Sequence, residues 1–393
     1  MTRTVRVGDV AEQIRGVSYD KEEASDTSAP GYLPILRAGN ITDAGLTFSD
    51  LVYVPKGRVS DSQRVRAGDV VIAASSGSLD VVGKAAAAKE DFDGGFGAFC
   101  KVLRPRATVD AAYFAHFFRT ASYRRRVSSL AAGANINNLR SGHLDDFALP
   151  LPPLAEQRRI ADILDRADAM RAKRREAIAL LDELQEATLE HVAAHRSSKY
   201  VELDHLLAEV YRYPTYYDIR YESDGIPEIR GELIQSDGTI DSSRGRLRFI
   251  SPATSSKYPR TVVEPGDLVM SVRGTVGKVG LVPPELGGAN MTANLIRLAP
   301  DRLRVEPVYV WHSMRGRSFQ AKLAASCSST TIATIKAPEL RKLTIRVPSI
   351  DVQREFAGRV DAIERLKAAH RASLAGMDAL FASLQHRAFR GEL

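Results

Sequence analysis

The sequence predicts an α+β fold made of two copies of one unit, each with a β-rich front part and a helical back part. Three observations support this prediction: an internal repeat, turn-and-strand patterns in the front parts, and helical periodicity in the back parts. The repeat is clearest where "LPLPPLAEQRRIADILD" at 149–165 aligns with "IRVPSIDVQREFAGRVD" at 345–361, an offset of 196 positions. The length of 393 residues also favours more than one domain.

The same offset holds without a gap over a longer stretch of the chain. Tyr113 and His116 align with Tyr309 and His312. Further upstream the offset drifts, as loop insertions would make it do: "VRAGDVVIAASSGSLDVVGK" parallels "VEPGDLVMSVRGTVGK", and the first copy is four residues longer. We therefore expect a pseudo-twofold internal repeat with front parts at 1–150 and 198–347 and helical parts at 151–197 and 348–393.

The front parts show short strands separated by turns. "RAGDVVIAAS" and "EPGDLVMSVR" are each a Gly-Asp turn followed by a short apolar strand, and "CKVLRP" and "NLIRLAP" are strands ended by proline. "DAAYFAHFFRTASYRRRV" and "EPVYVWHSMRGRSFQAKL" each predict one helix. The front parts should therefore be mixed domains rich in β-structure.

The back parts predict two long helices that pack on each other. Three prolines, the last of them Pro153, favour extended chain, so the first helix should begin at about Leu154. Apolar residues then recur at spacings of three and four, as in a coiled-coil seam. One matched level, Arg174 and His370, is polar, and is either a register device or an exposed gap. The expected packing residues are Ile160, Leu164, Ala167, Met170 and Leu181 in the first helix and Phe356, Val360, Ile363, Leu366 and Met377 in the second.

Composition and motifs exclude several classes of protein. The net charge of +7 favours a polyanionic partner, although a basic surface without function is equally compatible with it. Cys100 and Cys327 have neither disulfide nor metal-ligand spacing, which predicts no metal site and fits the cytoplasm. No apolar run approaches the roughly 18 residues that span a bilayer. No catalytic residue is expected, because a methyltransferase Asn-Pro-Pro signature is absent and "GSLDVVGKA" has Ala85 where a phosphate-binding loop needs Ser or Thr.

A front domain, the junction "PLPPLAEQRRI" and a long helix, followed by the same series again, resembles the specificity subunit of type I restriction–modification enzymes. The resemblance covers essentially the whole chain, and the second junction departs from the pattern at Asp351 and Val352. It implies that each front part is a target-recognition domain that reads one half of a split sequence in double-stranded DNA. The two helices would pack antiparallel, set the gap between the half-sites and dock two methyltransferase subunits.

The resemblance also implies how the chemistry is divided among subunits. The restriction and translocase subunits would join the complex through the methyltransferase subunits. S-adenosylmethionine, ATP and magnesium would be bound by those partner chains, so this chain should carry no cofactor and no catalytic site.

Candidate DNA contacts fall in three stretches of each front part. Proteins that read DNA sequence place Arg, Lys, Asn, Ser and Thr on loops, where these side chains reach base edges and phosphates. The first stretch follows the Gly-Asp strand, the second is "GANINNLR" or "SSTTIATIK", and the third is a basic segment near the middle of the front part. The residues are Ser75, Ser76, Ser78, Lys84, Asn135, Asn137, Asn138, Lys56 and Arg58 in the first copy and Arg273, Thr275, Lys278, Thr330, Thr331, Arg244, Arg246 and Lys257 in the second.

Two other functions are compatible with the same sequence. The chain could be a scaffold that holds two protein-binding modules apart with a coiled coil, or an enzyme with an unrecognised nuclease or methyltransferase site. A scaffold would bind duplex DNA weakly and only through salt-dependent charge attraction. An enzyme would act on DNA with a divalent metal or a methyl donor alone.

Overall fold

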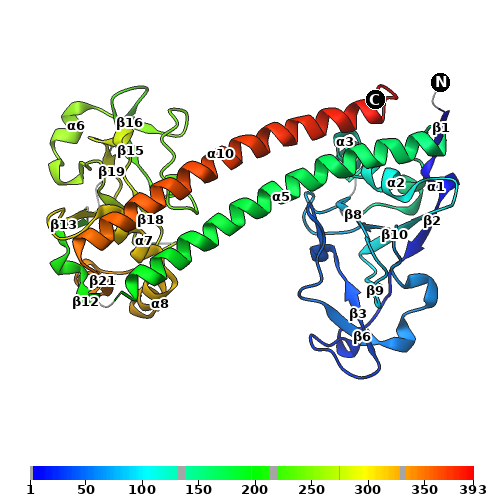
Figure 1. The fold of residues 1–393 in the computed structure, drawn as a ribbon, viewed down its shortest axis with the longest axis horizontal. Coiled ribbons are helices and arrows are strands. Elements are labelled where there is room, and N and C mark those ends of the chain that lie inside the picture. Colours follow the sequence, from blue (N-terminus) through cyan, green and yellow to red (C-terminus); the bar gives the residue numbers. More distant parts are fainter. Residues whose placement is uncertain (1–2, 132–137, 196, 213–218, 274, 328–332) are drawn as a thin grey trace. The chain divides into compact units, whose positions relative to one another are not determined.

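The computed structural model describes the chain except residues 1–2, 132–137, 196, 213–218, 274 and 328–332. It divides into two compact units (Figure 1). Unit 1 contains Met1–Ala177 and His370–Leu393, and unit 2 contains Ile178–Ala369. Each unit therefore combines one β-rich region with one end of each long helix.

Unit 1 is built on a four-stranded antiparallel sheet of order β2-β10-β7-β8. A three-stranded sheet, β6-β3-β9, and the pairs β1-β11 and β4-β5 complete its β-structure. Its strands are β1 (Arg3–Arg6), β2 (Ala11–Arg15), β3 (Tyr32–Leu36), β4 (Ile41–Thr42), β5 (Gly45–Leu46), β6 (Val52–Pro55), β7 (Val70–Ala73), β8 (Ala85–Ala87), β9 (Gly95–Phe96), β10 (Cys100–Pro105) and β11 (Ala148–Leu151). Its short helices are α1 (Val7–Val10), α2 (Ala111–Phe117), α3 (Ala121–Ala131) and α4 (Ser141–Asp145), with 3-10 turns η1 (Lys21–Glu23), η2 (Ala38–Asn40), η3 (Lys56–Arg58) and η4 (Asp61–Gln63).

Unit 2 repeats the central sheet in the order β13-β20-β17-β18. A four-stranded sheet, β14-β16-β15-β19, and the pair β12-β21 complete it. Its strands are β12 (Lys199–Glu202), β13 (Leu207–Arg212), β14 (Tyr221–Glu222), β15 (Ile226–Ile229), β16 (Arg248–Ile250), β17 (Leu268–Ser271), β18 (Val279–Leu281), β19 (Asn290–Met291), β20 (Leu295–Pro300) and β21 (Thr344–Val347). Its short helices are α6 (Pro252–Ser256), α7 (Pro307–Arg315), α8 (Arg317–Ser326) and α9 (Ala337–Arg341), with turns η5 (Leu203–His205), η6 (Gly231–Leu233), η7 (Pro259–Thr261) and η8 (Pro284–Leu286).

The Gly-Asp strands, β7 and β17, and the proline-ended strands, β10 and β20, are present as predicted. The prediction of one helix after each proline-ended strand is wrong, because both copies have two helices there. In unit 1, Thr120 caps the second helix: its hydroxyl accepts the N–H of Tyr123 at 3.2 Å. In unit 2, Gly316 between α7 and α8 has extended backbone, with φ −63° and ψ 149°.

The two long helices are α5 (Leu154–Ala193) and α10 (Ile350–Ala388). Ile160 and Leu164 of α5 are buried in the core of unit 1, which also contains Phe381 of α10. In unit 2, Phe356, Val360 and Ile363 of α10 are buried. Of the other expected packing residues, Ala167, Leu181 and Met377 are half-buried.

Met170 and Leu366 do not pack in the seam between the helices. Their side chains are 56% and 52% exposed. The seam advances by four residues from Ala167 to Arg171, and from Ile363 to Lys367, so the apolar residue one position earlier points away from it. Lys367 is only 3% exposed. The sequence prediction chose the apolar residue at this level, whereas the structure places a charged one there.

Arg174 and His370, which the sequence placed at one polar level of the helix pair, are in direct contact within unit 1. Arg174 and His370 are both half-buried, and the Arg174 guanidinium donates to Nδ1 of His370 at 2.6 Å. The two residues occupy the same position in the two copies. Such a contact between equivalent residues is what an antiparallel pairing of repeated helices produces at one level.

Candidate nucleic-acid interface

Three chain segments meet at Ala74, at the end of β7. The Ala74 N–H donates to the carbonyl of Phe99 at 2.8 Å, and the Ala74 carbonyl accepts the N–H of Leu139 at 2.7 Å. The next residue, Ser75, pairs with Asn138 in an antiparallel bridge. Because Ala74 and Leu139 are also buried, packing supports these hydrogen bonds. We call these five residues the first loop junction, and it brings together two of the predicted DNA-contacting stretches.

The same junction recurs in unit 2 around Val272. The Val272 N–H donates to the carbonyl of Asn294 at 3.0 Å, and its carbonyl accepts the N–H of Ile335 at 3.4 Å. Arg273 and Thr334 form the equivalent antiparallel bridge. These five residues are the second loop junction. The chain therefore builds one backbone arrangement twice, from segments that are far apart in sequence.

The side chains that project from the two junctions differ. Ser75 and Asn138 in the first correspond to Arg273 and Thr334 in the second. Asn138 and Arg273 are exposed. A carboxamide both donates and accepts hydrogen bonds, whereas a guanidinium only donates. Equivalent backbone positions thus present different hydrogen-bonding groups, which suits the recognition of two unlike targets.

The loop of unit 1 that connects β7 to β8 contains Ser75, Ser76 and Ser78, and helix α3 holds its base. Arg124 donates to the carbonyls of Val82 at 2.8 Å and Asp80 at 3.0 Å. Within the loop, the hydroxyl of Ser76 accepts the N–H of Ser78 at 3.2 Å. The loop returns to β8 through Gly83, whose φ is +77°. A Cβ there would also lie 2.4 Å from the Val127 side chain, so both conformation and space require glycine.

The corresponding loop of unit 2 is shorter and is held in the same way. Gln320, from helix α8, donates to the carbonyl of Gly277 at 3.1 Å. Gly277 has a φ of +93°. Thr275, a predicted contact residue, is exposed on this loop. The two loops therefore share an anchor and differ in length and in side chains.

Lys84 and Lys278 occupy equivalent positions where these loops return to the sheet. The carbonyl of Lys84 accepts the N–H of Ala73, and that of Lys278 accepts the N–H of Ser271, both at 2.9 Å. Lys84 is half-buried and Lys278 is exposed. Within the described part of the chain, neither ammonium forms an ion pair, so each charge is available to a phosphate.

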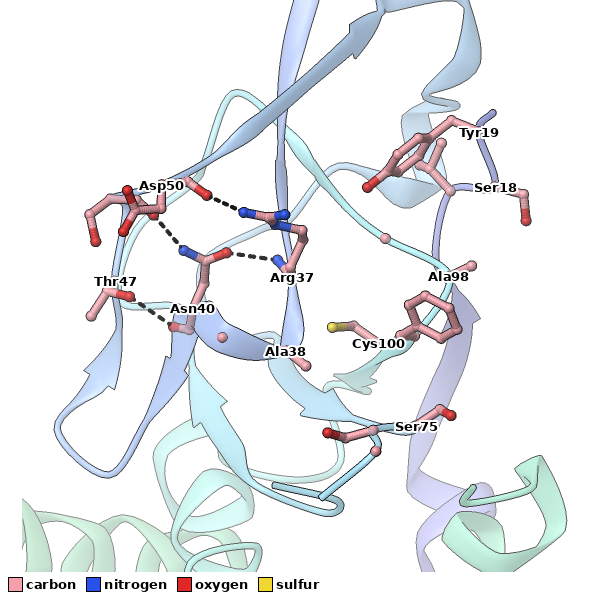
Figure 2. Close-up of a pocket in the computed structure, with 17 residues that line it drawn as sticks. Ser18, Tyr19, Arg37, Ala38, Asn40, Thr47, Asp50, Ser75, Ala98 and Cys100 are labelled. Atoms are coloured by element: carbon pink, nitrogen blue, oxygen red, sulfur yellow. Dashed lines mark hydrogen bonds between the residues drawn. The ribbon is translucent and has the colours of Figure 1, made fainter. Parts of the chain in front are cut away.

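A cavity of about 1040 Å³ opens beside the first loop junction (Figure 2). Ser75, Arg37 and Asn40 are among the residues that line it. The carboxamide of Asn40 is buried and accepts the N–H of Arg37 at 2.8 Å while it donates to the carbonyl of Ser49, also at 2.8 Å. Burial raises the pKa of the Cys100 thiol in this wall to about 12. The thiol is therefore protonated at neutral pH, and the cavity wall offers hydrogen-bonding groups and not a thiolate nucleophile.

The basic segment of unit 1 lies away from the first loop junction. Lys56 donates its N–H to the carbonyl of Gly31 at the start of β3, whereas Arg37, in the cavity wall, follows the end of β3. Five residues of strand span about 17 Å. Arg58 forms an ion pair with Glu23. The hydrogen bond that the Arg58 guanidinium donates within this pair lowers the pKa of the Glu23 carboxyl. Lys56 and Arg58 are thus not brought together with Ser75 and Asn138.

The basic segment of unit 2 is largely engaged within the protein. Arg244 forms an ion pair with Asp224 at 3.1 Å, and its guanidinium lies 5.1 Å from the centre of the Phe249 ring. The carbonyl of Arg246 accepts a hydrogen bond from Arg230 at 2.7 Å. Lys257 is exposed at the end of α6. None of these contacts joins the segment to the second loop junction.

Four predicted contact residues, Asn135, Asn137, Thr330 and Thr331, lie outside the described residues. Sequence reasoning missed Phe99 and Asn294, whose carbonyls help to form the two loop junctions. The prediction considered only polar residues on loops. The sequence does contain a signal for these two residues, because each directly precedes a proline-ended strand.

Across the described residues, no cluster of His, Cys, Asp and Glu could hold a metal ion. No helix in that part of the chain is long and apolar enough to cross a membrane.

The chain thus contains two junctions with one backbone arrangement and unlike side chains. Comparison with known proteins identifies the family to which the chain belongs. Residues 2–180 match the family model described as the type I restriction modification DNA specificity domain. The chain is 32% identical to the type I restriction enzyme EcoKI specificity subunit of Escherichia coli strain K12, with 98% of this chain and 88% of that protein covered.

A second relative and two solved structures are also similar to nearly the whole chain. The chain is 30% identical to the StySPI specificity subunit of Salmonella potsdam, covering 99% of this chain and 89% of that one. Two solved structures share the fold with a TM-score of 0.58: the type I specificity subunit from M. genitalium, at 12% identity over 99% and 96% of the chains, and a chain of a type I restriction–modification system, at 20% identity over 100% and 98%. The protein belongs to the family of type I restriction–modification specificity subunits. It is the DNA specificity subunit, the non-catalytic component, of such a system.

Proposed function

We propose that each β-rich region reads one half of a bipartite target in double-stranded DNA, and that the two loop junctions are where bases are read. The observation that carries this proposal is the recurrence of one junction with different side chains. Asn138 offers the paired donor and acceptor that match adenine, and Arg273 offers the paired donors that match guanine. Lys84 and Lys278, which flank the loops at equivalent positions, contact phosphates and orient each module on its half-site.

The helices α5 and α10 set the gap between the half-sites and dock the partner subunits. Helix α5 runs without interruption from residues of unit 1 into residues of unit 2, so it links the modules without a flexible loop. Two methyltransferase subunits bind the helices and recruit the restriction and translocase subunits in the cytoplasm. Those partners bind S-adenosylmethionine, ATP and magnesium. Because both modules belong to one chain, binding of the second half-site is intramolecular, which raises the overall affinity.

Selection from random DNA duplexes tests this function. The chain, in complex with its methyltransferase subunits, should enrich one bipartite motif whose two parts are separated by a constant gap. Replacing residues 1–150 with the front part of another specificity subunit should change one part of the motif only. A single contiguous motif, or enrichment that follows salt concentration without sequence preference, would contradict the proposal.

A further inference from the structure

The backbone of Phe99 is fixed at the first loop junction while its side chain remains in solvent. Its carbonyl accepts two hydrogen bonds, from the N–H groups of Ala74 at 2.8 Å and Ser75 at 3.0 Å. The next residue, Cys100, is buried as the first residue of β10. Nevertheless the Phe99 side chain is 69% exposed. A large apolar side chain is thus carried by a backbone position that is hydrogen-bonded to Ala74 and Ser75, and it is not used in the core.

Asn294 occupies the equivalent position in unit 2. Its carbonyl accepts the N–H of Val272 at 3.0 Å, it directly precedes β20, and it is exposed. The central residue of the junction is buried and apolar in both units, as Ala74 in unit 1 and Val272 in unit 2. The exposed position, in contrast, changes from phenylalanine to asparagine.

Single exposed apolar residues are common on protein surfaces and need no explanation by themselves. This position is different because it shares a backbone frame with the predicted contact residues Ser75 and Asn138 in unit 1 and with the predicted contact residue Arg273 in unit 2. It also follows their pattern: at Ser75 and Arg273, and at Asn138 and Thr334, the frame is likewise kept while the side chain changes. Phe99 also lines the cavity beside the first junction, so it has open space next to it.

We propose that Phe99 and Asn294 are specificity-determining residues, each the third base-contacting position of its half-site. This inference rests on the proposed function. Phe99 has no hydrogen-bonding group and makes an apolar contact with the 5-methyl group of a thymine in the major groove. Asn294 pairs through its carboxamide with the N6 amino group and N7 of an adenine. One position thus selects unlike bases in the two half-sites.

The test compares the motifs that wild-type complex, Phe99→Ala and Asn294→Ala select from random duplexes. Phe99→Ala should reduce the preference for thymine at one position of one half-site by about 10-fold, and Asn294→Ala should do the same for adenine in the other half-site. Leu303→Ala is the matched control, since Leu303 is 92% exposed and lies outside both junctions, and it should leave the motif unchanged. Thermal unfolding should be the same for all variants, because each altered side chain is exposed.

Modified duplexes then identify the contacted atoms. Replacing the selected thymine with uracil, which lacks the 5-methyl group, should weaken binding of the wild-type complex and have no effect on Phe99→Ala. Replacing the selected adenine with 7-deazaadenine should weaken the wild-type complex and not Asn294→Ala. If the wild-type complex selects no bipartite motif, the proposed function itself has failed. If it does, and either variant keeps the wild-type motif or weakens binding equally for all sequences, the assignment of that residue is overturned.

Discussion

The carboxamide of Gln157, in helix α5, forms hydrogen bonds with the first β-rich region through both its oxygen and its nitrogen. Its carbonyl oxygen accepts the N–H of Asp110 at 2.8 Å, and its amide group donates to the carbonyl of Pro152 at 2.8 Å. Gln353 makes the same two contacts in the second copy, both at 2.9 Å. Both glutamines are buried. The exit from each β-rich region is therefore held by the first turns of the helix that follows it.

Replacing Gln157 with alanine should destabilise unit 1 by about 2–4 kcal/mol, because two buried polar backbone groups lose their partners. Urea unfolding followed by circular dichroism measures this change as a lower transition midpoint. Arg158→Ala is the control, since Arg158 is exposed on the same helical turn, and its midpoint should stay near that of the wild type. Equal midpoints for the two variants would show that the glutamine contacts contribute little.

The alignment of the two copies identifies Gln157 and Gln353 as equivalent residues but does not explain them. The partner of Gln157 in the β-rich region, Asp110, lies 47 positions earlier in the chain. Sequence periodicity reports which face of an element is buried, and it contains no information on such a contact. The junction could thus be located from its prolines and the repeat, whereas its means of attachment required the structure.

At the scale of elements, each unit contains the same ion pair between the two long helices with the copies exchanged. Arg171 of α5 pairs with Asp378 of α10 at 2.6 Å in unit 1. Lys367 of α10 pairs with Asp182 of α5 at 2.7 Å in unit 2. The sequence predicted where the seam runs but preferred Met170 at this level, since apolar residues define a seam in most coiled coils. Charged residues in a seam restrict the helices to one register, because a shifted register would leave a buried charge without its partner.

Lys367 also determines the protonation of His312. Its ammonium donates to the carbonyl oxygen of Gln185 at 2.9 Å, so the amide group of Gln185 faces Nε2 of His312 at 3.2 Å. That amide can only donate, and Nε2 must therefore be the unprotonated nitrogen of a neutral imidazole. Burial, together with the nearby charges of Arg315 and Lys367, lowers the pKa of His312 to about 3.

Lowering the pH should therefore destabilise unit 2. The unfolded chain takes up the His312 proton near pH 6.5, whereas the folded chain does so only near pH 3. The contribution of His312 to the unfolding free energy is fully present above pH 6.5 and is lost as the pH falls toward 3, with about 2 kcal/mol lost between pH 7 and pH 5. Urea unfolding at both pH values measures it, and His312→Gln, which does not titrate, should show a pH dependence smaller by that amount. An identical pH dependence in the two proteins would refute the neutral assignment.

At the scale of the whole molecule, the two-copy plan could be predicted because repetition is visible in sequence. The loop junctions could be predicted only in part. Ser75 and Asn138 were predicted as polar loop residues, whereas Phe99 is apolar and joins them only through backbone hydrogen bonds across the fold. Arg58 and Arg244 were predicted from residue type alone, and their ion pairs with Glu23 and Asp224 are contacts that residue type does not reveal.

If the long helices set the gap between half-sites, lengthening both of them should lengthen the gap. Seven residues inserted after Arg175 in α5 and after Ala369 in α10 preserve the seam, because a heptad returns each side chain to the same face. The insertion adds about 10.5 Å of helix, which corresponds to roughly three base pairs at 3.4 Å each. Selection from random duplexes should return the original half-sites separated by a gap about three base pairs longer.

Two controls separate this effect from general disruption. Seven residues inserted after Leu303, which is 92% exposed in a turn of unit 2, should leave the gap unchanged. Four residues inserted in α5 alone shift its seam relative to α10, and should reduce stability without defining a new gap. A matched heptad insertion that changes the bases read, or that leaves the gap as it was, would show that the helices do not measure the distance. The half-site spacing would then have to be set by contacts with the methyltransferase subunits.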